Sequence, residues 1–211
     1  MSLTALAAYS LAASLREMEP DASLPRDLPG RYGRVIRDLE RLLDSADALS
    51  VVAGGWAVWH HGYAGRVTED VDIVIGHSKL DAVKELASLC GFDFLVPPEG
   101  RWPKLQHRTT AIDVDILPEF GVPGIPSRPA PVAIGNPQRY QAVSGTLRYI
   151  TLEGLIELKL GAGRAKDVAD IIELVKQHPA RLTAITDHLT KLHPQYPARF
   201  QQLIIQAQDE S

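Results

Sequence analysis

Hydrophobic residues follow two patterns along the first 150 residues of the chain. In three segments apolar side chains recur every three or four positions, which predicts amphipathic helices over 32–48, 56–62 and 79–90. The alternation of these segments with short apolar runs predicts an α/β domain that ends near residue 150. The apolar runs predict strands over 50–53, 70–75, 92–96, 104–108, 111–117 and 142–150.

Beyond residue 150 only the helical pattern continues. Thr151 is a good N-cap for the first of these helices, and two glycines, Gly161 and Gly163, are expected to end it. The predicted C-terminal helices cover 152–160, 164–177, 180–190 and 195–208.

Three stretches outside these elements complete the predicted organisation. Leucines at helical spacing predict an amphipathic helix over 3–15, and prolines among charged residues indicate a linker over 18–31. Proline and glycine over 118–137 predict a long irregular loop. The predicted parts of the chain are therefore an N-terminal helix and linker over 1–31, a core over 32–150 and a helical region over 151–211.

Composition and charge restrict the class of protein. The chain has 211 residues, 45% of them hydrophobic, and a formal charge of −4. This is typical of a globular protein and provides none of the overall basic charge on which nonspecific nucleic-acid binding depends. Cys90 is the only cysteine, so an intrachain disulfide is impossible and a reducing, cytoplasmic location is expected. No apolar run is long enough to predict a membrane span.

Paired aspartates supply the strongest candidate chemistry. Asp70 and Asp72 open a predicted strand and project from the same face, because strand side chains alternate. Neighbouring carboxylates on an apolar strand favour a cation between them, and Mg²⁺ prefers such oxygen ligands. Asp113 and Asp115 compete as the source of a third ligand, and Asp115 is preferred because it lies nearer the C-terminal end of its strand. The alternative is that these aspartates only begin strands in solvent.

Two further features fit a phosphate-bearing substrate. Gly54 and Gly55 lie between a predicted strand and helix, where backbone N–H groups bind phosphate, although most glycine pairs are simply turns. Lys159 occupies a position in the apolar stripe of its helix. It therefore either pairs with an anion, such as a triphosphate or a catalytic carboxylate, or extends along the helix edge into water.

Several charged residues have two or more interpretations. Arg66 either contacts a phosphate, holds the aspartates or ends a loop. Asp167 borders a core stripe and either bonds the preceding turn through Arg164 or takes part in catalysis. Lys166 and Asp170 have the i,i+4 spacing of a solvated surface pair.

Signatures of other reaction classes are missing from the sequence. His60 and His61 are adjacent, which makes them poor zinc ligands, and they are assigned to a helix surface. The chain contains no Ser-His-Asp signature, Walker loop or dinucleotide-binding fingerprint.

Together these motifs resemble the nucleotidyltransferase superfamily related to DNA polymerase beta. Within it, the chain is most similar to small bacterial AbiEii-type toxins and aminoglycoside nucleotidyltransferases, over about residues 35–178. The resemblance implies an α+β fold, in which a small mixed sheet is flanked by helices and a helical C-terminal part completes the active site. The matching residues are Gly54-Gly55-Trp56, Arg66-x-Thr68-x-Asp70-x-Asp72, Ile112-Asp113-Val114-Asp115 and Leu158-Lys159-Leu160 with Arg164-x-Lys166-Asp167-x-x-Asp170.

The resemblance also implies an activity: transfer of a nucleoside monophosphate from an NTP to an acceptor hydroxyl, with release of pyrophosphate. Asp70 and Asp72 would bind two Mg²⁺ ions, with Mn²⁺ as the alternative. Asp115 would bind the catalytic ion and help to deprotonate the acceptor. The implied nucleotide-binding residues are Gly54, Gly55, Arg66, Lys159 and Asp167.

The acceptor and partners stay open at this point. Toxin-like relatives suggest a tRNA 3′ end as acceptor and a cognate antitoxin as partner, whereas the resistance enzymes suggest a small molecule such as an aminoglycoside. The acidic overall charge favours a cationic small molecule, and the basic residues over 159–166 favour a phosphate-rich acceptor. Two alternatives remain: a catalytically degenerate module that binds nucleotide or a partner, and a structural protein whose N-terminal and C-terminal helices bury a partner.

Overall fold

The computed structural model describes residues 24–28, 30–65, 67–96, 98 and 102–210. The helix predicted over 3–15 lies outside the described residues. The α-helices are α2 (Gly30–Ser45), α3 (Gly54–His60), α4 (Leu80–Leu86), α5 (Leu152–Ala162), α6 (Ala165–Gln177), α7 (Leu182–Leu192) and α8 (Gln195–Asp209). The strands are β1 (Ser50–Val52), β2 (Val71–Ile75), β3 (Phe92–Leu95), β4 (Lys104–His107), β5 (Asp113–Pro118), β6 (Gly124–Ile125), β7 (Arg128–Pro129) and β8 (Arg148–Tyr149).

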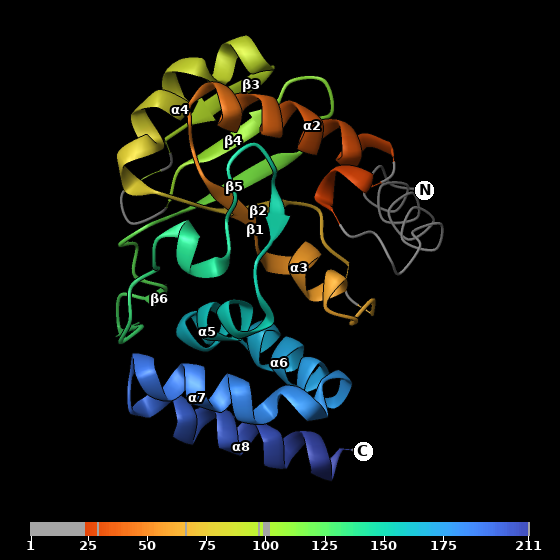
Figure 1. The fold of residues 1–211 in the computed structure, drawn as a ribbon, viewed down its shortest axis with the longest axis vertical. Helices are drawn as coiled ribbons and strands as arrows, with labels where there is room; N and C mark the ends of the chain where they lie inside the picture. The colour runs from red at the N-terminus through yellow and green to blue at the C-terminus, as the bar shows by residue number, and fades with distance from the viewer. Residues whose placement is uncertain (1–23, 29, 66, 97, 99–101, 211) are drawn as a thin grey trace.

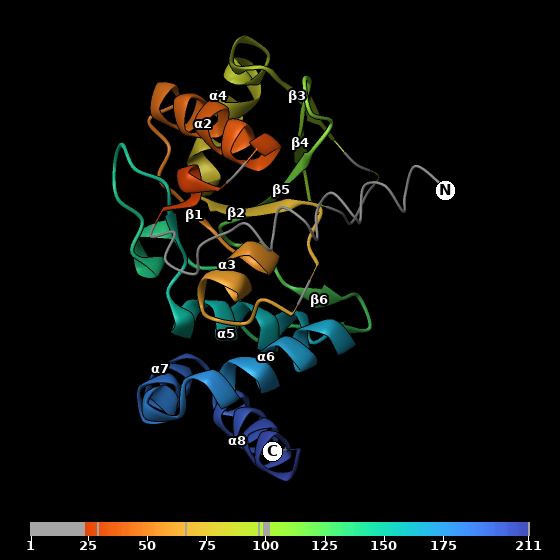
Figure 2. The ribbon, with the colours of Figure 1, turned by 90° about the vertical axis from the view of Figure 1, so that its right-hand side faces the viewer.

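A six-stranded mixed sheet of order β3-β4-β5-β2-β1-β8 forms the centre of the molecule. Strand β2 runs parallel to β5 and β1 parallel to β8, while the other pairs are antiparallel. Helices α2 and α4 cover one face, and α3 lies on the other, between the sheet and α5 (Figures 1 and 2). This confirms the predicted fold class, a small mixed sheet flanked by helices with a helical C-terminal part.

One hydrophobic core joins the sheet to the C-terminal helices. Its buried residues extend along the chain from Leu28 to Ala207. Helix α5 packs against α6, α7 and α8, and α6 packs against α8 (Figure 1). The apolar positions that predicted the first helix are all buried in α2, namely Tyr32, Val35, Ile36, Leu39, Leu42 and Leu43.

The structure differs from the predicted elements at four places. The helix predicted over 79–90 is α4 followed by a short 3-10 helix, and the loop predicted over 118–137 contains the β6–β7 hairpin. The strand predicted over 142–150 is reduced to the two residues of β8. Gly161 lies inside α5 and only Gly163 ends it, with a φ of +61°. A Cβ on Gly161 would lie 3.2 Å from the Tyr196 hydroxyl, so this glycine allows α8 to approach α5 closely.

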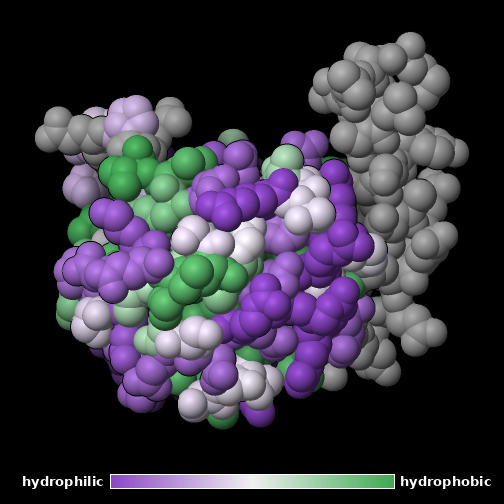
Figure 3. Space-filling model, turned by 90° about the horizontal axis from the view of Figure 1, so that it is seen from above, coloured by the Kyte–Doolittle hydropathy of each residue, from purple (hydrophilic) through white to green (hydrophobic). Residues whose placement is uncertain are grey.

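Hydrophobic surface is broken into separate areas on the face above α2 and α4. That face is mostly hydrophilic and carries isolated hydrophobic patches (Figure 3). Single exposed apolar side chains such as Leu89 (78% exposed) are common on globular proteins. Among the described residues, no helix combines the length and apolarity that crossing a membrane requires.

His61 is part of the packing rather than of a free helix surface, which corrects the prediction for this residue. Its Nε2 lies 2.8 Å from the Ile150 carbonyl oxygen, so the neutral ring donates this hydrogen bond and ties the end of α3 to the segment before α5. The neighbouring His60 ring stacks on Tyr149, with ring centroids 4.1 Å apart. Burial lowers the pKa of His61 to about 4, since the charged ring loses hydration there.

We expect His61 to make the folded protein less stable as the pH falls. In the unfolded chain the pKa of His61 is about 6.5. As pH falls from 7 to 4, His61 therefore becomes protonated in the unfolded state but stays largely neutral in the folded state. The free energy of unfolding should therefore fall over this range. His61→Gln, which keeps an N–H donor, should reduce that loss by roughly 1–3 kcal/mol, discounted for partial exposure of the ring.

Urea unfolding measured between pH 7 and pH 4 tests this expectation. His77→Gln is a matched control because His77 is exposed. Equal pH dependence in wild type and His61→Gln would show that His61 makes no such contribution.

Candidate active site

A cavity of about 500 Å³ opens between β2, β5, the β6–β7 hairpin and helices α5 and α6. Its volume is in the range of sites that hold small molecules of nucleotide size. Its charged lining consists of Asp70, Asp72, Asp115 and Asp167 with Lys104, Lys159, Arg164 and Lys166. Four carboxylates thus share one cavity with four cationic side chains.

The parallel pairing of β2 with β5 brings the acids together. Asp72 lies directly opposite Asp115 in the register of the two strands, and Asp70 immediately precedes β2. Asp115 is the third residue of β5, so the expectation that it lies near the C-terminal end of its strand is wrong. Because parallel strands begin at the same edge, the acids meet near the beginnings of β2 and β5.

Asp113 points to different partners from Asp115, although both residues share a strand face. Lys104 and Gln106 donate hydrogen bonds to the Asp113 carboxylate, the second at 3.0 Å. Asp115 lines the cavity, and Asp113 is not among the residues that line it. Of the two candidates for the third ligand, the geometry favours Asp115.

The positive side chains nearby only partly neutralise the negative charge of Asp70, Asp72 and Asp115. Burial, together with Asp70 and Asp115, raises the pKa of Asp72 to about 6, and Lys159 and Arg164 offset this only in part. The pKa of Asp115 is also raised, mainly by burial and then by Asp70. An added cation near these oxygens would relieve the repulsion, so the donor set fits a divalent metal ion.

In the described part of the chain, no group of three or more His, Cys, Asp or Glu side chains is arranged so that it could hold a metal ion by itself. Mg²⁺ is usually bound by one or two carboxylates together with water and substrate phosphates, and does not need such a group. The acids therefore fit an ion that is shared with a phosphate-bearing substrate.

Gly54 and Gly55 make room for the acids, which is the kind of close approach that a glycine pair at this turn permits. Gly54 has a φ of +59°, and a Cβ there would lie 1.6 Å from Asp72 Oδ2. A Cβ on Gly55 would lie 2.5 Å from Thr68 Oγ1, which in turn donates to Asp70 Oδ1 at 3.1 Å. Gly54 lines the cavity, whereas Gly55 is absent from its lining. Phosphate binding by this glycine pair stays a prediction.

Lys159 is buried and paired, so of the two interpretations the buried one is correct. Its Nζ lies 2.6 Å from Asp170 Oδ2 and 3.6 Å from Asp167 Oδ1. Asp170 is 3% exposed, which shows that the predicted solvated pair with Lys166 is wrong. The i,i+4 spacing rule failed because it carries no information on which side of α6 packs against α5, and Asp170 lies on that side.

Asp167 holds the turn between α5 and α6, as one of its two interpretations stated. The Arg164 backbone N–H and guanidinium donate to it, the Nε at 2.7 Å from Oδ2. Burial alone would raise the pKa of Asp167, but the Arg164 hydrogen bonds and the charge of Lys159 lower it. Asp167 is thus an ionised carboxylate at the cavity wall.

The remaining predicted residue and two missed ones complete the site. Arg66 lies outside the described residues. Lys104 and Trp102 also line the cavity, and the sequence analysis did not predict either of them as a site residue. The register of the β4–β5 hairpin, which places Lys104 opposite Asp115, was the signal that could have found Lys104.

The chain is similar to two solved structures of the antibiotic-resistance factor ANT(2″)-Ia. One is a crystal structure in complex with adenylyl-2″-tobramycin, with 14% identity, a TM-score of 0.49 and coverage of 83% of this chain and 96% of that one. The other is a solution structure, with 13% identity, a TM-score of 0.43 and coverage of 83% and 90%. At this degree of overlap neither likeness bears on the activity of the chain. No family model and no curated protein matches the sequence.

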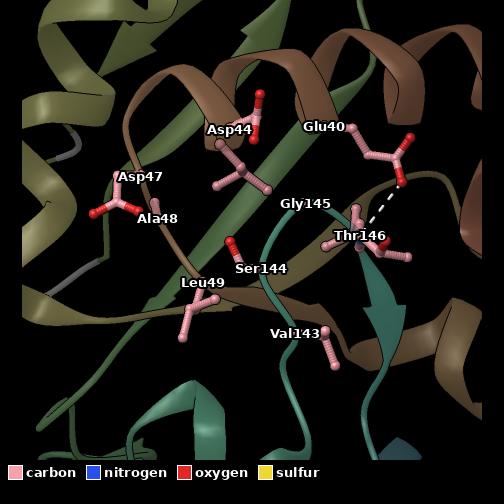
Figure 4. Close-up of a pocket in the computed structure, with 11 residues that line it drawn as sticks. Glu40, Asp44, Asp47, Ala48, Leu49, Val143, Ser144, Gly145 and Thr146 are labelled. Carbon is pink, nitrogen blue, oxygen red and sulfur yellow. Dashed lines mark hydrogen bonds between the residues drawn. The ribbon is translucent and has the colours of Figure 1, made fainter.

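A second, smaller cavity lies at the other side of the sheet, between the end of α2 and the segment 143–147 (Figure 4). Its volume is about 40 Å³, which leaves room for little more than a water molecule. Glu40 accepts a hydrogen bond from the Leu147 N–H there, and Asp47 pairs with Lys79. These acids are occupied by local contacts and are separate from the acids of the large cavity.

Proposed function

We propose that the protein is a Mg²⁺-dependent nucleotidyltransferase, which moves a nucleoside monophosphate from an NTP to an acceptor hydroxyl. One observation carries the proposal: Asp70, Asp72 and Asp115 share a cavity with cationic side chains from β4, α5 and α6. The acids suit a divalent ion, and the cations suit the triphosphate that such an ion accompanies.

In this proposal the acids hold the ion and the cations hold the substrate. Mg²⁺, or Mn²⁺ in its place, supplies neutralisation of the charge that develops on the phosphate oxygens. Lys159, Arg164 and Lys166 bind the triphosphate by charge, and Gly54 offers backbone N–H at the start of α3.

In the proposed reaction Asp115 takes the acceptor's proton. Its raised pKa, due first to burial, makes it a stronger base than an ordinary aspartate. The acceptor oxygen forms a bond to the α-phosphorus as the bond to pyrophosphate breaks, and the hydroxyl proton passes to the Asp115 carboxylate. Positioning and charge neutralisation lower the barrier of such transfers.

The acceptor has two candidates. A tRNA 3′ end, in an enzyme of toxin–antitoxin type, suits the basic groups at the cavity, among which Lys166 is exposed. A small hydroxyl-bearing molecule of aminoglycoside type suits the overall charge of −4. The cavity also has an apolar wall, formed by Trp102, Val122 and Ile125, against which a ring of either acceptor can pack.

Transfer of label from each α-labelled NTP tests the proposal. The purified protein is incubated with Mg²⁺ and either total bacterial tRNA or a panel of aminoglycosides, and the products are separated. We expect Mg²⁺-dependent labelling of one acceptor class and release of pyrophosphate, and EDTA should abolish both.

The outcome also decides between the acceptors. Label in RNA supports the toxin-like enzyme, and label in a small molecule supports the alternative. NTP binding without transfer to any acceptor would replace the enzyme with a nucleotide-binding module, and absence of both binding and transfer would contradict the proposal.

A further inference from the structure

Lys159 and Asp170 form an ion pair beneath the cavity that the proposed reaction leaves unexplained. We propose that Asp170 is a positioning residue that fixes the ammonium group of Lys159 where the triphosphate lies. The consequence for nucleotide binding rests on the proposed function, whereas the pair itself is a feature of the fold.

The geometry of the pair is that of a fixed contact. Lys159 Nζ lies 2.6 Å from Asp170 Oδ2, and the two side chains are 5% and 4% exposed. Lys159 projects from α5 and Asp170 from α6, so the contact joins the two helices that form one wall of the cavity. Lys159 itself reaches the cavity lining.

Asp170, rather than Asp167, is the close partner. Asp167 already accepts three hydrogen bonds from Arg164, at 2.7 Å to Nε and 3.1 Å to both the backbone N and Nη2. Its distance to Lys159 Nζ is 3.6 Å, beyond a strong hydrogen bond. The position of the ammonium is therefore set mainly by Asp170.

A buried ion pair contributes little to stability compared with apolar residues of the same size, because desolvation of both charges opposes their attraction. The pair instead holds the ammonium group of Lys159 in one position, although the lysine side chain has four rotatable bonds. Preorganised charge of this kind acts on a substrate without reorganisation when the substrate binds. A lysine that had to leave water first would bind the triphosphate less well.

The alternative is that Asp170 only compensates a buried charge. Asp170→Glu separates the two roles, because it keeps the negative charge but moves the carboxylate by about one methylene, or roughly 1.5 Å. A compensating role tolerates this shift, and a positioning role does not. Asp170→Asn removes the charge while keeping the size and an acceptor oxygen.

The test measures binding of each of the four ribonucleoside triphosphates with Mg²⁺ by calorimetry, and unfolding by urea for every variant. The proteins are wild type, Asp170→Glu, Asp170→Asn, Lys159→Met and the double variant Lys159→Met Asp170→Asn. Glu173→Gln is the matched control, since Glu173 lies one turn further along α6 and pairs with Lys176 on its outer side.

We expect Asp170→Glu and Asp170→Asn to weaken binding roughly tenfold or more, equivalent to about 1.4 kcal/mol. In the Lys159→Met background Asp170→Asn should change binding less than about twofold, since Asp170 acts through Lys159. If Asp170→Asn does not fold, Asp170→Glu and the double variant still test the positioning role of Asp170. The double variant is expected to fold because it leaves no unpaired lysine charge in the interior.

Two results would overturn the inference while leaving the proposed function intact. One is wild-type affinity in Asp170→Glu, and the other is an equal loss on Asp170→Asn with and without Lys159. A wild-type protein that binds none of the four nucleotides would instead remove the proposed function, and the inference with it.

Discussion

The double variant Asp70→Asn Asp72→Asn is expected to lose nucleotidyl transfer by a factor of about a thousand or more, equivalent to roughly 4 kcal/mol of barrier. Both carboxylates line the cavity, and burial, followed by the charges of Asp70 and Asp115, raises the pKa of Asp72 to about 6. The amides keep the shape of the site but remove the two negative charges that would hold the ion in the proposed reaction. The fold should survive, because this change also removes the repulsion between neighbouring acids.

Transfer of label per unit time, measured for both proteins at saturating Mg²⁺ and NTP, checks this expectation. Asp113→Asn is the matched control, because Asp113 lies on the same strand face as Asp115 but is itself absent from the cavity lining, and its bonds are to Gln106 and to Lys104 at the cavity edge. It should retain activity within about threefold of wild type. Full turnover by the double variant would show that these carboxylates do not hold the catalytic ion.

Gly54→Ala is expected to remove activity and to lower the free energy of unfolding by roughly 2–4 kcal/mol. Two causes add. The backbone φ of +59° disfavours any residue with a Cβ, and that Cβ would lie 1.6 Å from Asp72 Oδ2. Either α3 or the Asp72 side chain must move, and movement of Asp72 displaces the proposed metal ligand.

Gly145→Ala separates these two causes. Gly145 has a similar φ of +70°, but no atom lies within 4 Å of a Cβ placed there. This control should cost about 1 kcal/mol of stability and leave transfer unchanged, since only the backbone strain applies. The two variants are compared by urea unfolding and by label transfer. Equal behaviour of Gly54→Ala and Gly145→Ala would contradict the packing of Gly54 against Asp72.

The sequence predicted the elements well where a single periodicity continued over many residues. The buried stripe of α2 and the two strands β4 and β5 were all predicted, because helix and strand patterns there are local. The β6–β7 hairpin escaped prediction, since two-residue strands carry too few side chains for a pattern. The division of the chain into parts over 1–31, 32–150 and 151–211 stays a prediction.

The sequence predicted the acids of the candidate site but not the contacts between the site residues. Asp70, Asp72 and Asp115 carry a spacing signal, and the structure places them in one cavity. The burial of Asp170 beside Lys159 depends on how α6 docks on α5, which no local spacing reports. The contact of Gly54 with Asp72 likewise joins two segments 18 residues apart and required the folded chain.

Binding of Mn²⁺, followed by electron paramagnetic resonance with and without a non-hydrolysable NTP, tests the central claim most directly. Wild type and Asp72→Asn are compared at the same protein concentration. The prediction is that wild type binds the ion more tightly when nucleotide is present, because the carboxylates and the phosphates share it, and that Asp72→Asn loses this gain. Equal Mn²⁺ binding by the two proteins in the presence of nucleotide would contradict the assignment of the acids as metal ligands.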